Sequence, residues 1–329
     1  MKEMRKSIVR NDNTLGKKID TIFGMTFFPI VKYLKYYYFR GNPSFIKIET
    51  TNFCNSQCLY CPNKSLKRKK GFMKDTLFEK IIKECVSWKI KEIHLCNFGE
   101  PLVDKKISEK LKLIKDLRPE IKTVIFTNGG LLYEKTCREI MLAGLDELCI
   151  SFDGFSKNHF EKYRYPLKYE LVLENIENSI KIKEELKTKT SIILQPVYDK
   201  NVIIPEKLSA FLSFWSDKVD DISIQKLHDW HGYVKNEGYV NKNIICRDLF
   251  EYMTINWDGS VVPCCLDYEG ENILGNVNRQ TIKQVWLGKE FTEFRRKLLR
   301  NVSSIPICSE CKMRYYNFRY PHLSSLFWR

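Results

Sequence analysis

Short apolar runs alternate with amphipathic stretches along the middle of the chain, from residue 45 to about residue 227. Six of the runs have the length and the β-branched composition of strands, and they cover residues 45–49, 92–96, 122–126, 147–152, 191–197 and 221–227. The stretches between them repeat apolar residues every three or four positions, which predicts helices over residues 76–88, 105–117, 131–143, 169–186 and 206–216. Strand–helix alternation of this kind predicts parallel, right-handed βαβ units. Six units are fewer than the eight of a closed barrel, so an α/β fold with an open, partial barrel or a doubly wound sheet is expected.

The alternation stops near residue 233, and the rest of the chain has a different pattern. Residues 256–263 (NWDGSVVP) hold an Asp-Gly turn between apolar runs and predict a hairpin, and residues 281–299 predict one helix. We therefore expect a basic, aromatic N-terminal extension (residues 1–44), a core domain (45–233), and a small cysteine-bearing domain with a C-terminal tail (234–329).

Composition narrows the class of protein but does not select a function. Of the 329 residues, 43% are hydrophobic and 29% are charged, which excludes a disordered or fibrous chain. No run is long and apolar enough for a transmembrane helix, and no secretory signal is present, so a cytoplasmic location is expected. Residues 21–39 are apolar but interrupted by Pro29, Lys32 and Lys35, which favours packing on the barrel over weak contact with a membrane surface.

The net charge of +15 permits an anionic small-molecule substrate, RNA or an anionic surface as partner. The lysines are spread over many predicted helices, so the charge alone does not choose among these partners. No groove or sheet motif of interleaved basic and aromatic residues follows the N-terminal extension, and no DNA partner is expected.

Twelve cysteines in a chain without an export signal point to metal binding or catalysis rather than to disulfides. Cys54, Cys58 and Cys61 follow the first predicted strand with the spacing C-x3-C-x2-C. Structural zinc takes four ligands, and no fourth Cys or His lies nearby. Three thiolates suit a [4Fe–4S] cluster with one iron left open for another ligand. A zinc site is the alternative.

This spacing after the first strand of a six-unit βα pattern, with Tyr60 before the last cysteine, resembles the radical S-adenosylmethionine (SAM) superfamily. The resemblance implies a partial (β/α)6 barrel whose three-cysteine cluster binds SAM through the open iron. One-electron reduction by a flavodoxin- or ferredoxin-like protein would then give a 5′-deoxyadenosyl radical that abstracts a substrate hydrogen.

Further motifs follow the next predicted strands in order: FGEP (residues 98–101), TNGG (127–130), SFDG (151–154) and HFEKYR (159–164). The family resemblance implies that the first of them holds the methionine ammonium of SAM and that the later ones face its ribose and carboxylate. Asn97 stands where many members have glycine. The implied SAM-binding residues are Tyr60, Gly99, Glu100, Asn128, Ser151, Asp153 and Arg164.

A second set of cysteines, Cys246, Cys264, Cys308 and Cys311, has the spacing C-x17-C-x43-C-x2-C. Four thiolates satisfy either zinc or an iron–sulfur cluster. The segment resembles the SPASM/twitch auxiliary-cluster domain of radical SAM enzymes. Because no cysteine follows Cys311, the resemblance implies the shorter, twitch form with one second [4Fe–4S] cluster.

Two thiols and one loop are candidates for contact with the substrate. Cys265 lies next to a predicted ligand and is a candidate hydrogen-atom donor, unless it points into the packed interior as a strand neighbour. Cys96, near the end of the second predicted strand, is the weaker alternative. The loop after the last core strand would face the gap between the two clusters, and its candidate substrate residues are His228, Asp229, Trp230 and His231.

The resemblance therefore implies a radical SAM oxidoreductase or epimerase that acts on a hydroxylated small molecule, such as a sugar, an aminocyclitol or a nucleotide-linked sugar. Radical modification of a peptide is the alternative, although 44 residues before the first strand are too few for a winged peptide-recognition domain. A zinc- or RNA-binding protein without radical chemistry is the more distant alternative.

Overall fold

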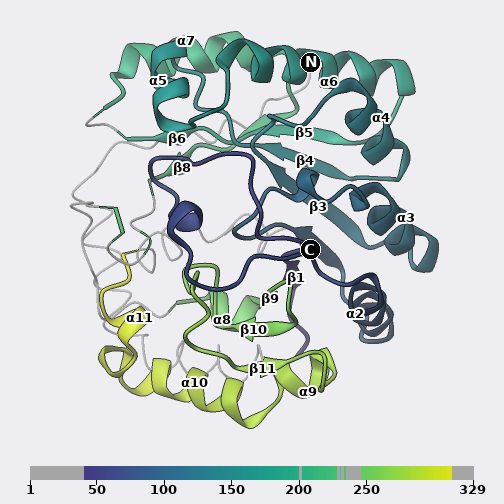
Figure 1. Ribbon diagram of the computed structural model, residues 1–329, viewed down its shortest axis with the longest axis vertical. Helices are drawn as coiled ribbons and strands as arrows, with labels where there is room; N and C mark the ends of the chain where they lie inside the picture. Colours follow the sequence, from purple (N-terminus) through teal and green to yellow (C-terminus); the bar gives the residue numbers. More distant parts are fainter. Residues whose placement is uncertain (1–40, 200–201, 228–229, 231–232, 235–245, 313–329) are drawn as a thin grey trace, which may run out of the picture.

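The computed structural model describes residues 41–199, 202–227, 230, 233–234 and 246–312. Its centre is an open nine-stranded sheet with the order β11-β10-β9-β1-β2-β3-β4-β5-β7 (Figure 1). Six of these strands come from the alternating part of the chain and pair in parallel in sequence order. They are β1 (Phe45–Ile48), β2 (Glu92–Leu95), β3 (Lys122–Thr127), β4 (Glu147–Ile150), β5 (Ser191–Leu194) and β7 (Asp221–Ile222). The predicted N-terminal segment 21–39 lies outside the described residues.

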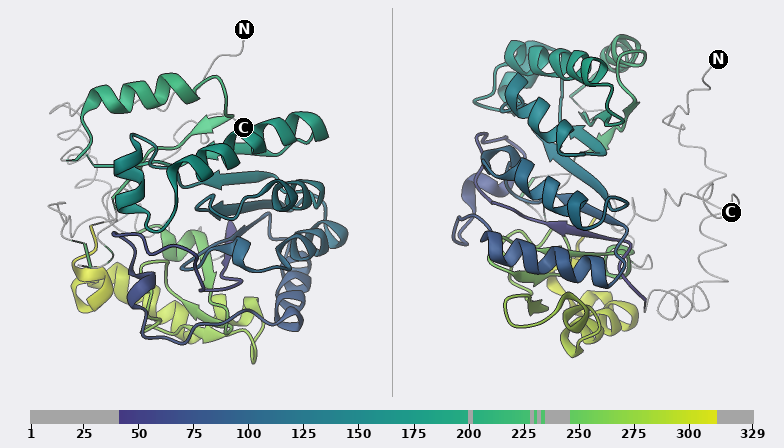
Figure 2. Two further views of the ribbon diagram at one scale, coloured as in Figure 1. Left: turned by 45° about the horizontal axis from the view of Figure 1, so that its top comes forward. Right: turned by 90° about the vertical axis from the view of Figure 1, so that its right-hand side faces the viewer.

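Each predicted helix of the core is present between its two strands. These helices are α2 (Asp75–Ser87), α3 (Ile107–Leu117), α4 (Glu134–Leu142), α6 (Tyr169–Leu186) and α7 (Pro205–Trp215). Helices α2, α3, α4 and α6 lie in a row along one side of the sheet (Figures 1 and 2). Strands in sequential order, with their right-handed crossovers on one side, make a partial barrel rather than a doubly wound sheet.

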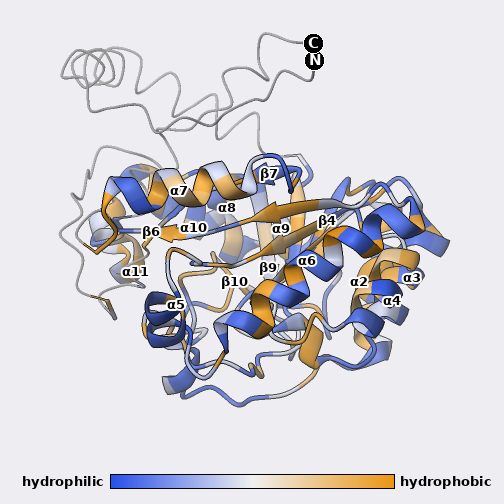
Figure 3. Ribbon diagram, turned by 90° about the horizontal axis from the view of Figure 1, so that it is seen from above, coloured by the Kyte–Doolittle hydropathy of each residue, from blue (hydrophilic) through white to orange (hydrophobic). Residues whose placement is uncertain are grey.

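The core lies between the sheet and this row of helices. In β1, Ile46 and Ile48 are fully buried toward the helices, and Phe78 and Ile81 of α2 belong to the same apolar cluster. Burying an isoleucine side chain stabilises the fold by roughly 1.5–3 kcal/mol. Figure 3 shows the resulting pattern of apolar strands and helices with one polar face. Alternation along β1 turns its other residues, among them Lys47, to the opposite face of the sheet, where they are only partly buried.

Two predicted strands are divided in the structure. Residues 191–197 and 221–227 end early in the main sheet, and β6 (Val197–Tyr198) pairs instead with β8 (Gln225–Lys226) in a separate two-stranded sheet. Pro196 has no N–H for the main ladder. The N–H of Val197 donates to Asp153 Oδ1 at 2.7 Å rather than to a strand. A short helix, α5 (Lys157–Tyr163), was not predicted, and its N-terminus is capped by the Ser156 side chain.

The C-terminal part forms the predicted hairpin and joins the same sheet. Strands β9 (Tyr252–Ile255) and β10 (Ser260–Val262) are antiparallel, with Gly259 at a φ of 85° in the Asp-Gly turn. Strand β9 pairs in parallel with β1. The predicted helix 281–299 is two helices, α9 (Ile282–Trp286) and α10 (Lys289–Arg300), which meet at Gly288.

The remaining elements are short: η1 (Pro62–Ser65), η2 (Pro101–Val103), α8 (Asp248–Glu251), β11 (Gly275–Asn276), η3 (Val302–Ser304) and α11 (Pro306–Ser309). Among the described residues, none of the helices combines the length and apolar character needed to cross a membrane.

Candidate active site

The first three cysteines lie in the loop that leaves β1. This loop is part of the purple segment that follows β1 in Figure 1. Ser56 organises this loop, because its Oγ lies 3.1 Å from Cys58 Sγ and its N–H donates to Cys54 Sγ at 3.4 Å. Asn128 Nδ2 donates to the same Cys54 sulfur at 3.7 Å. Cys58 is close enough to Cys54 and Cys61 to raise the pKa of both thiols electrostatically. The loop therefore presents three converging sulfurs with hydrogen-bond donors aimed at them.

The donor set of this loop fits an iron–sulfur cluster. Burial raises the pKa of Cys54 to about 12 and that of Cys61 to about 11, so metal binding has to displace their protons. Hydrogen bonds to cluster sulfurs are one of the ways in which proteins tune such clusters. Within the described ranges, no three His, Cys, Asp or Glu side chains are arranged to hold a single metal ion.

Glu100 links the loop after β2 to the loop after β3. Its carboxylate is buried, with Oε1 accepting from Thr127 Oγ1 at 2.8 Å and from Leu102 N at 3.1 Å. Oε2 accepts from Asn128 N at 2.7 Å. Burial outweighs these three donors and raises the pKa of Glu100 to about 7. The carboxyl thus stands ready to change protonation, or to take a cationic partner, near neutral pH.

Gly99, beside Glu100, has no room for a side chain. A Cβ there would lie 2.0 Å from the carbonyl oxygen of Thr51, in the segment that leads to the first cysteine. The next residue extends the contact, since the N–H of Glu100 donates to the carbonyl of Phe53 at 2.9 Å. Close approach of these two backbones explains why glycine occupies this position.

The structure joins three of the predicted SAM-binding residues to one another. Arg164 donates to Asp153 through Nε at 2.8 Å and through Nη2 at 3.1 Å, and the Tyr60 hydroxyl donates to the same carboxylate. The Arg164 guanidinium also lies 5.5 Å from the centre of the Tyr60 ring. Asp153 is fully buried and Arg164 nearly so. The half-buried Ser151 follows β4, and its N–H donates to Thr127 O at 2.8 Å.

The second set of cysteines also comes together. Cys246 has Cys308 and Cys311 as electrostatic neighbours, and Cys264 has Cys246 and Cys308. Burial raises the pKa of Cys246 and of Cys264 well above the ordinary thiol value. Four sulfurs from three separate segments suit a closed cluster site. The roles of both sets as ligands remain predictions.

A polar group that the sequence analysis missed occupies the inner face of the barrel beside the second set. Burial lowers the pKa of Lys47, but Cys265, Cys96 and Asp248 raise it, and the net effect is an increase. Its Nζ lies 4.3 Å from the centre of the Tyr252 ring. The Tyr252 hydroxyl donates to Asp248 at 2.6 Å and lies 3.9 Å from Cys265 Sγ. Both candidate hydrogen donors, Cys265 and Cys96, thus interact electrostatically with Lys47.

Of the four predicted substrate residues, only Trp230 is described, and His228, Asp229 and His231 lie outside the described residues. The Trp230 ring packs edge-on against the ring of Phe98, the residue before Gly99 and Glu100, with 5.2 Å between the ring centres. Phe98 is also 5.8 Å from Tyr268, which follows the cysteine pair of the C-terminal hairpin. Trp230 and Tyr268 therefore both pack against Phe98, which precedes Gly99 and Glu100.

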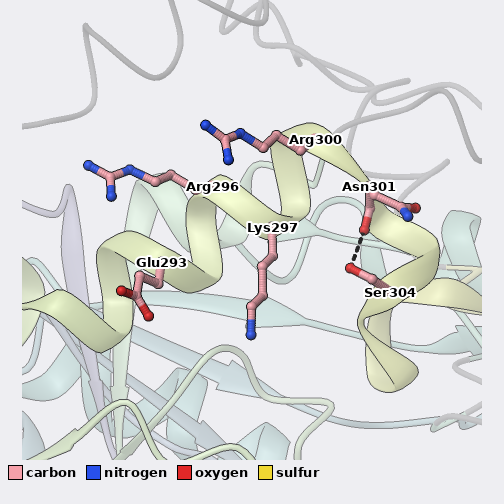
Figure 4. A pocket seen from close by; sticks show the side chains of 6 residues that line it. All are labelled: Glu293, Arg296, Lys297, Arg300, Asn301 and Ser304. Carbon is pink, nitrogen blue, oxygen red and sulfur yellow. Dashed lines mark hydrogen bonds between the residues drawn. The ribbon is translucent and has the colours of Figure 1, made fainter.

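A buried ion pair that was not predicted from the sequence links the two cysteine-bearing regions. Glu49 at the end of β1 accepts two hydrogen bonds of 2.7 Å from the Arg68 guanidinium. Arg68 Nε donates at 2.6 Å to the carbonyl of Tyr268. A separate hollow of about 330 Å³ on α10 and η3 is lined by none of the predicted site residues (Figure 4).

Comparison with known proteins agrees with this arrangement. Residues 48–203 match the model of the radical SAM superfamily, and residues 246–312 match that of the SPASM iron–sulfur cluster-binding domain. The S-adenosyl-L-methionine-dependent 2-deoxy-scyllo-inosamine dehydrogenase of Niallia circulans is 24% identical over 272 residues, which are 82% of this chain and 92% of the relative.

Solved structures show the same fold. BtrN in complex with AdoMet and 2-DOIA superposes with a TM-score of 0.59 at 20% identity, over 82% of this chain and 93% of that one. Streptococcus suis SuiB bound to precursor peptide SuiA superposes with a TM-score of 0.67 at 15% identity, over 94% of this chain and 78% of that one. The matched domains bind a [4Fe–4S] cluster with SAM and an auxiliary iron–sulfur cluster. The chain therefore belongs to the radical SAM superfamily and carries a C-terminal SPASM domain.

Proposed function

We propose that this radical SAM enzyme dehydrogenates a hydroxylated small molecule of the aminocyclitol or sugar class. The observation that carries the proposal is the similarity to the Niallia circulans dehydrogenase, which extends over 82% of this chain and 92% of that relative. Bound SAM and its cluster supply the hydrogen-abstracting radical, and the auxiliary cluster supplies an acceptor for one electron.

In this proposal each set of residues has one task. Cys54, Cys58 and Cys61 hold the SAM-binding cluster, and Cys246, Cys264, Cys308 and Cys311 hold a single auxiliary cluster. The residues that position SAM are Tyr60, Gly99, Glu100, Asn128, Ser151, Asp153 and Arg164. Several of them already have partners in this structure, such as Arg164 with Asp153, so their first effect is to fix the loops around SAM.

Lys47 is the residue proposed to meet the substrate. It lies on the inner face of the barrel, electrostatically coupled to Cys96 and Cys265, beside the second set of cysteines. A hydroxyl in contact with an ammonium group loses its proton more easily. Dehydrogenation of a carbinol removes one hydrogen atom, one proton and one electron, and the charge of Lys47 favours departure of the proton.

The test is anaerobic turnover with SAM, dithionite and 2-deoxy-scyllo-inosamine, followed by a panel of cyclitols and sugars. We expect 5′-deoxyadenosine and a ketone in equal amounts. Cys54→Ala should abolish both products and lower the iron content from about eight to about four per chain. Cys137→Ala, which removes a buried thiol from the helical layer, is the matched control and should retain both. SAM cleavage without a ketone from any member of the panel would contradict the dehydrogenase assignment.

Epimerisation is a second candidate, because Cys265 Sγ lies 3.9 Å from the Tyr252 hydroxyl and interacts electrostatically with Lys47. A thiol donor exchanges its hydrogen with water, so an epimerase reaction in D2O places one deuterium on the product carbon. Cys265→Ala should abolish that product and leave a dehydrogenase reaction intact. A ketone without deuterium incorporation would exclude the epimerase.

A further inference from the structure

Three large apolar side chains are exposed at the loop of the first cysteines. Phe53, directly before Cys54, is 39% exposed, and Leu59, directly after Cys58, is 49% exposed. Phe72 is 46% exposed, and its ring centre lies 5.2 Å from that of Phe53. Single exposed apolar residues are common, but neighbouring ones at a functional loop indicate contact with a partner.

The same segment is strongly basic. From Phe53 to Lys74 the sequence contains six basic residues and no acidic one. Lys64, Lys69 and Lys74 are exposed, and none of them forms an ion pair with another described residue. We call Phe53, Leu59, Phe72 and these three lysines the basic patch.

Acidic residues close to the basic patch are already paired. Asp75 forms ion pairs with Lys106 and Lys110, and the Glu269 carboxylate accepts from the backbone N–H groups of residues 67 and 68. Lysines of the patch therefore keep their charge available to a partner.

The backbone beneath the patch is well fixed. Met73 N donates to Thr50 O at 2.7 Å and Gly71 N donates to Asn52 Oδ1 at 2.8 Å. Met73 is buried, and the extended chain turns Phe72 and Lys74 outward on either side of it. A groove of about 410 Å³ continues from Phe72 and Lys74 toward the start of α3. The surface is thus preformed, with an apolar centre and a charged rim, as interfaces have.

We propose that the basic patch is the docking site of a small acidic electron-transfer protein, flavodoxin-like or ferredoxin-like, that reduces the SAM-binding cluster. The inference rests on the proposed function, because only a cluster at Cys54, Cys58 and Cys61 needs electrons at this place. Opposite charge speeds the encounter, and the small apolar centre suits the short-lived interfaces of redox partners. Phe53 and Leu59 adjoin the proposed ligands in sequence, so a partner seated on them is one residue away from the cluster.

The experiment compares two reductants on the reconstituted holoenzyme. Formation of 5′-deoxyadenosine is measured with dithionite, and with an acidic flavodoxin kept reduced by NADPH and its reductase. For the triple variant Lys64→Glu, Lys69→Glu, Lys74→Glu we expect the KM for flavodoxin to rise by about tenfold or more. The dithionite-supported rate should stay within about twofold of wild type, because none of these side chains belongs to the proposed SAM site. Added salt should lower the flavodoxin-supported rate of the wild type. It should therefore narrow the difference in that rate between the wild type and the triple variant.

A matched control reverses the same number of charges on α10, where Arg296, Lys297 and Arg300 are exposed around the hollow of Figure 4. The proposal expects no change in the flavodoxin KM for this control. An equal rise in the flavodoxin KM in both triple variants, or a rise in the α10 variant alone, would overturn the proposal. If the patch triple variant fails to retain iron, Phe72→Ser replaces it, with an expected rise in KM of about threefold.

The two proposals fail in different ways. Unchanged flavodoxin kinetics in the patch variant, with normal dithionite turnover, would discard the docking site and leave the proposed function standing. A wild-type holoenzyme that cleaves SAM with neither reductant would remove the proposed function and the docking site with it.

Discussion

Removal of the Asp153 carboxylate should be one of the most damaging single changes in the core domain. The residue is 0% exposed and accepts hydrogen bonds from Arg164 Nε at 2.8 Å, Arg164 Nη2 at 3.1 Å, Val197 N at 2.7 Å and the Tyr60 hydroxyl. Asp153→Ala leaves the Arg164 cation, which is 5% exposed, without its carboxylate. Breaking a buried pair in this way costs about 3–5 kcal/mol. Because Tyr60 stands between two cysteines of the first loop, iron retention should suffer as well.

Urea unfolding of the metal-free protein measures the first effect, and loss of iron to a chelator from the holoprotein measures the second. Asp153→Asn keeps the shape but not the charge, so we expect a smaller loss of about 1.5–3 kcal/mol. Asp153→Leu combined with Arg164→Met removes both charges and should recover most of the stability. An Asp153→Ala protein within about 1 kcal/mol of wild type, with unchanged iron release, would refute the reasoning.

Three further predictions concern the neighbouring loops. The pKa of Glu100 is raised from 4.5 to about 7, so the folded chain holds this proton more tightly than the unfolded chain does. The stability of the metal-free protein should therefore fall as the pH rises from about 5 to 7. Glu100→Gln should remove this pH dependence from the midpoints of urea unfolding. Gly99→Ala puts a Cβ 2.0 Å from a backbone oxygen and should weaken SAM binding, measured by equilibrium dialysis, by about tenfold or more. Arg68→Met strands the buried Glu49 carboxylate and should destabilise the chain by about 3 kcal/mol, whereas adding Glu49→Gln should restore much of it in the same assay.

Hydrophobic periodicity was enough to locate the six parallel strands of the core and the five helices between them, because helix-covered parallel strands carry long apolar patterns. It did not predict the short helix α5, which has only one buried residue, Phe160. It did not show where β5 and β7 leave the main sheet. That divergence depends on Pro196 and on the hydrogen bond from Val197 to Asp153, a contact between segments 44 residues apart. The break at Gly288 between α9 and α10 was likewise hidden, since apolar residues continue with helical spacing on both sides of it.

Spacing of the cysteines in the sequence predicted which thiols come together, because each set lies in one or a few short segments. Lys47 and its neighbours were missed for the opposite reason. Their proximity is created by pairing of β1 with β2 and β9, and no single segment displays it. A signal was present nonetheless: a lysine at the centre of the apolar run FIKIE is unusual for a strand of a parallel sheet, because such strands are mostly apolar.

The pairing of β9 with β1 determines which truncated forms of the chain keep the sheet edge covered. Residues 252–255 cover the free side of β1, whose next neighbour on the other side is β2. A polypeptide ending before β9 would expose β1 as an edge strand, with backbone N–H and C=O groups open to pairing with another copy. We expect such a fragment to aggregate during expression, whereas fragments that retain residues up to the end of β10 keep that edge closed.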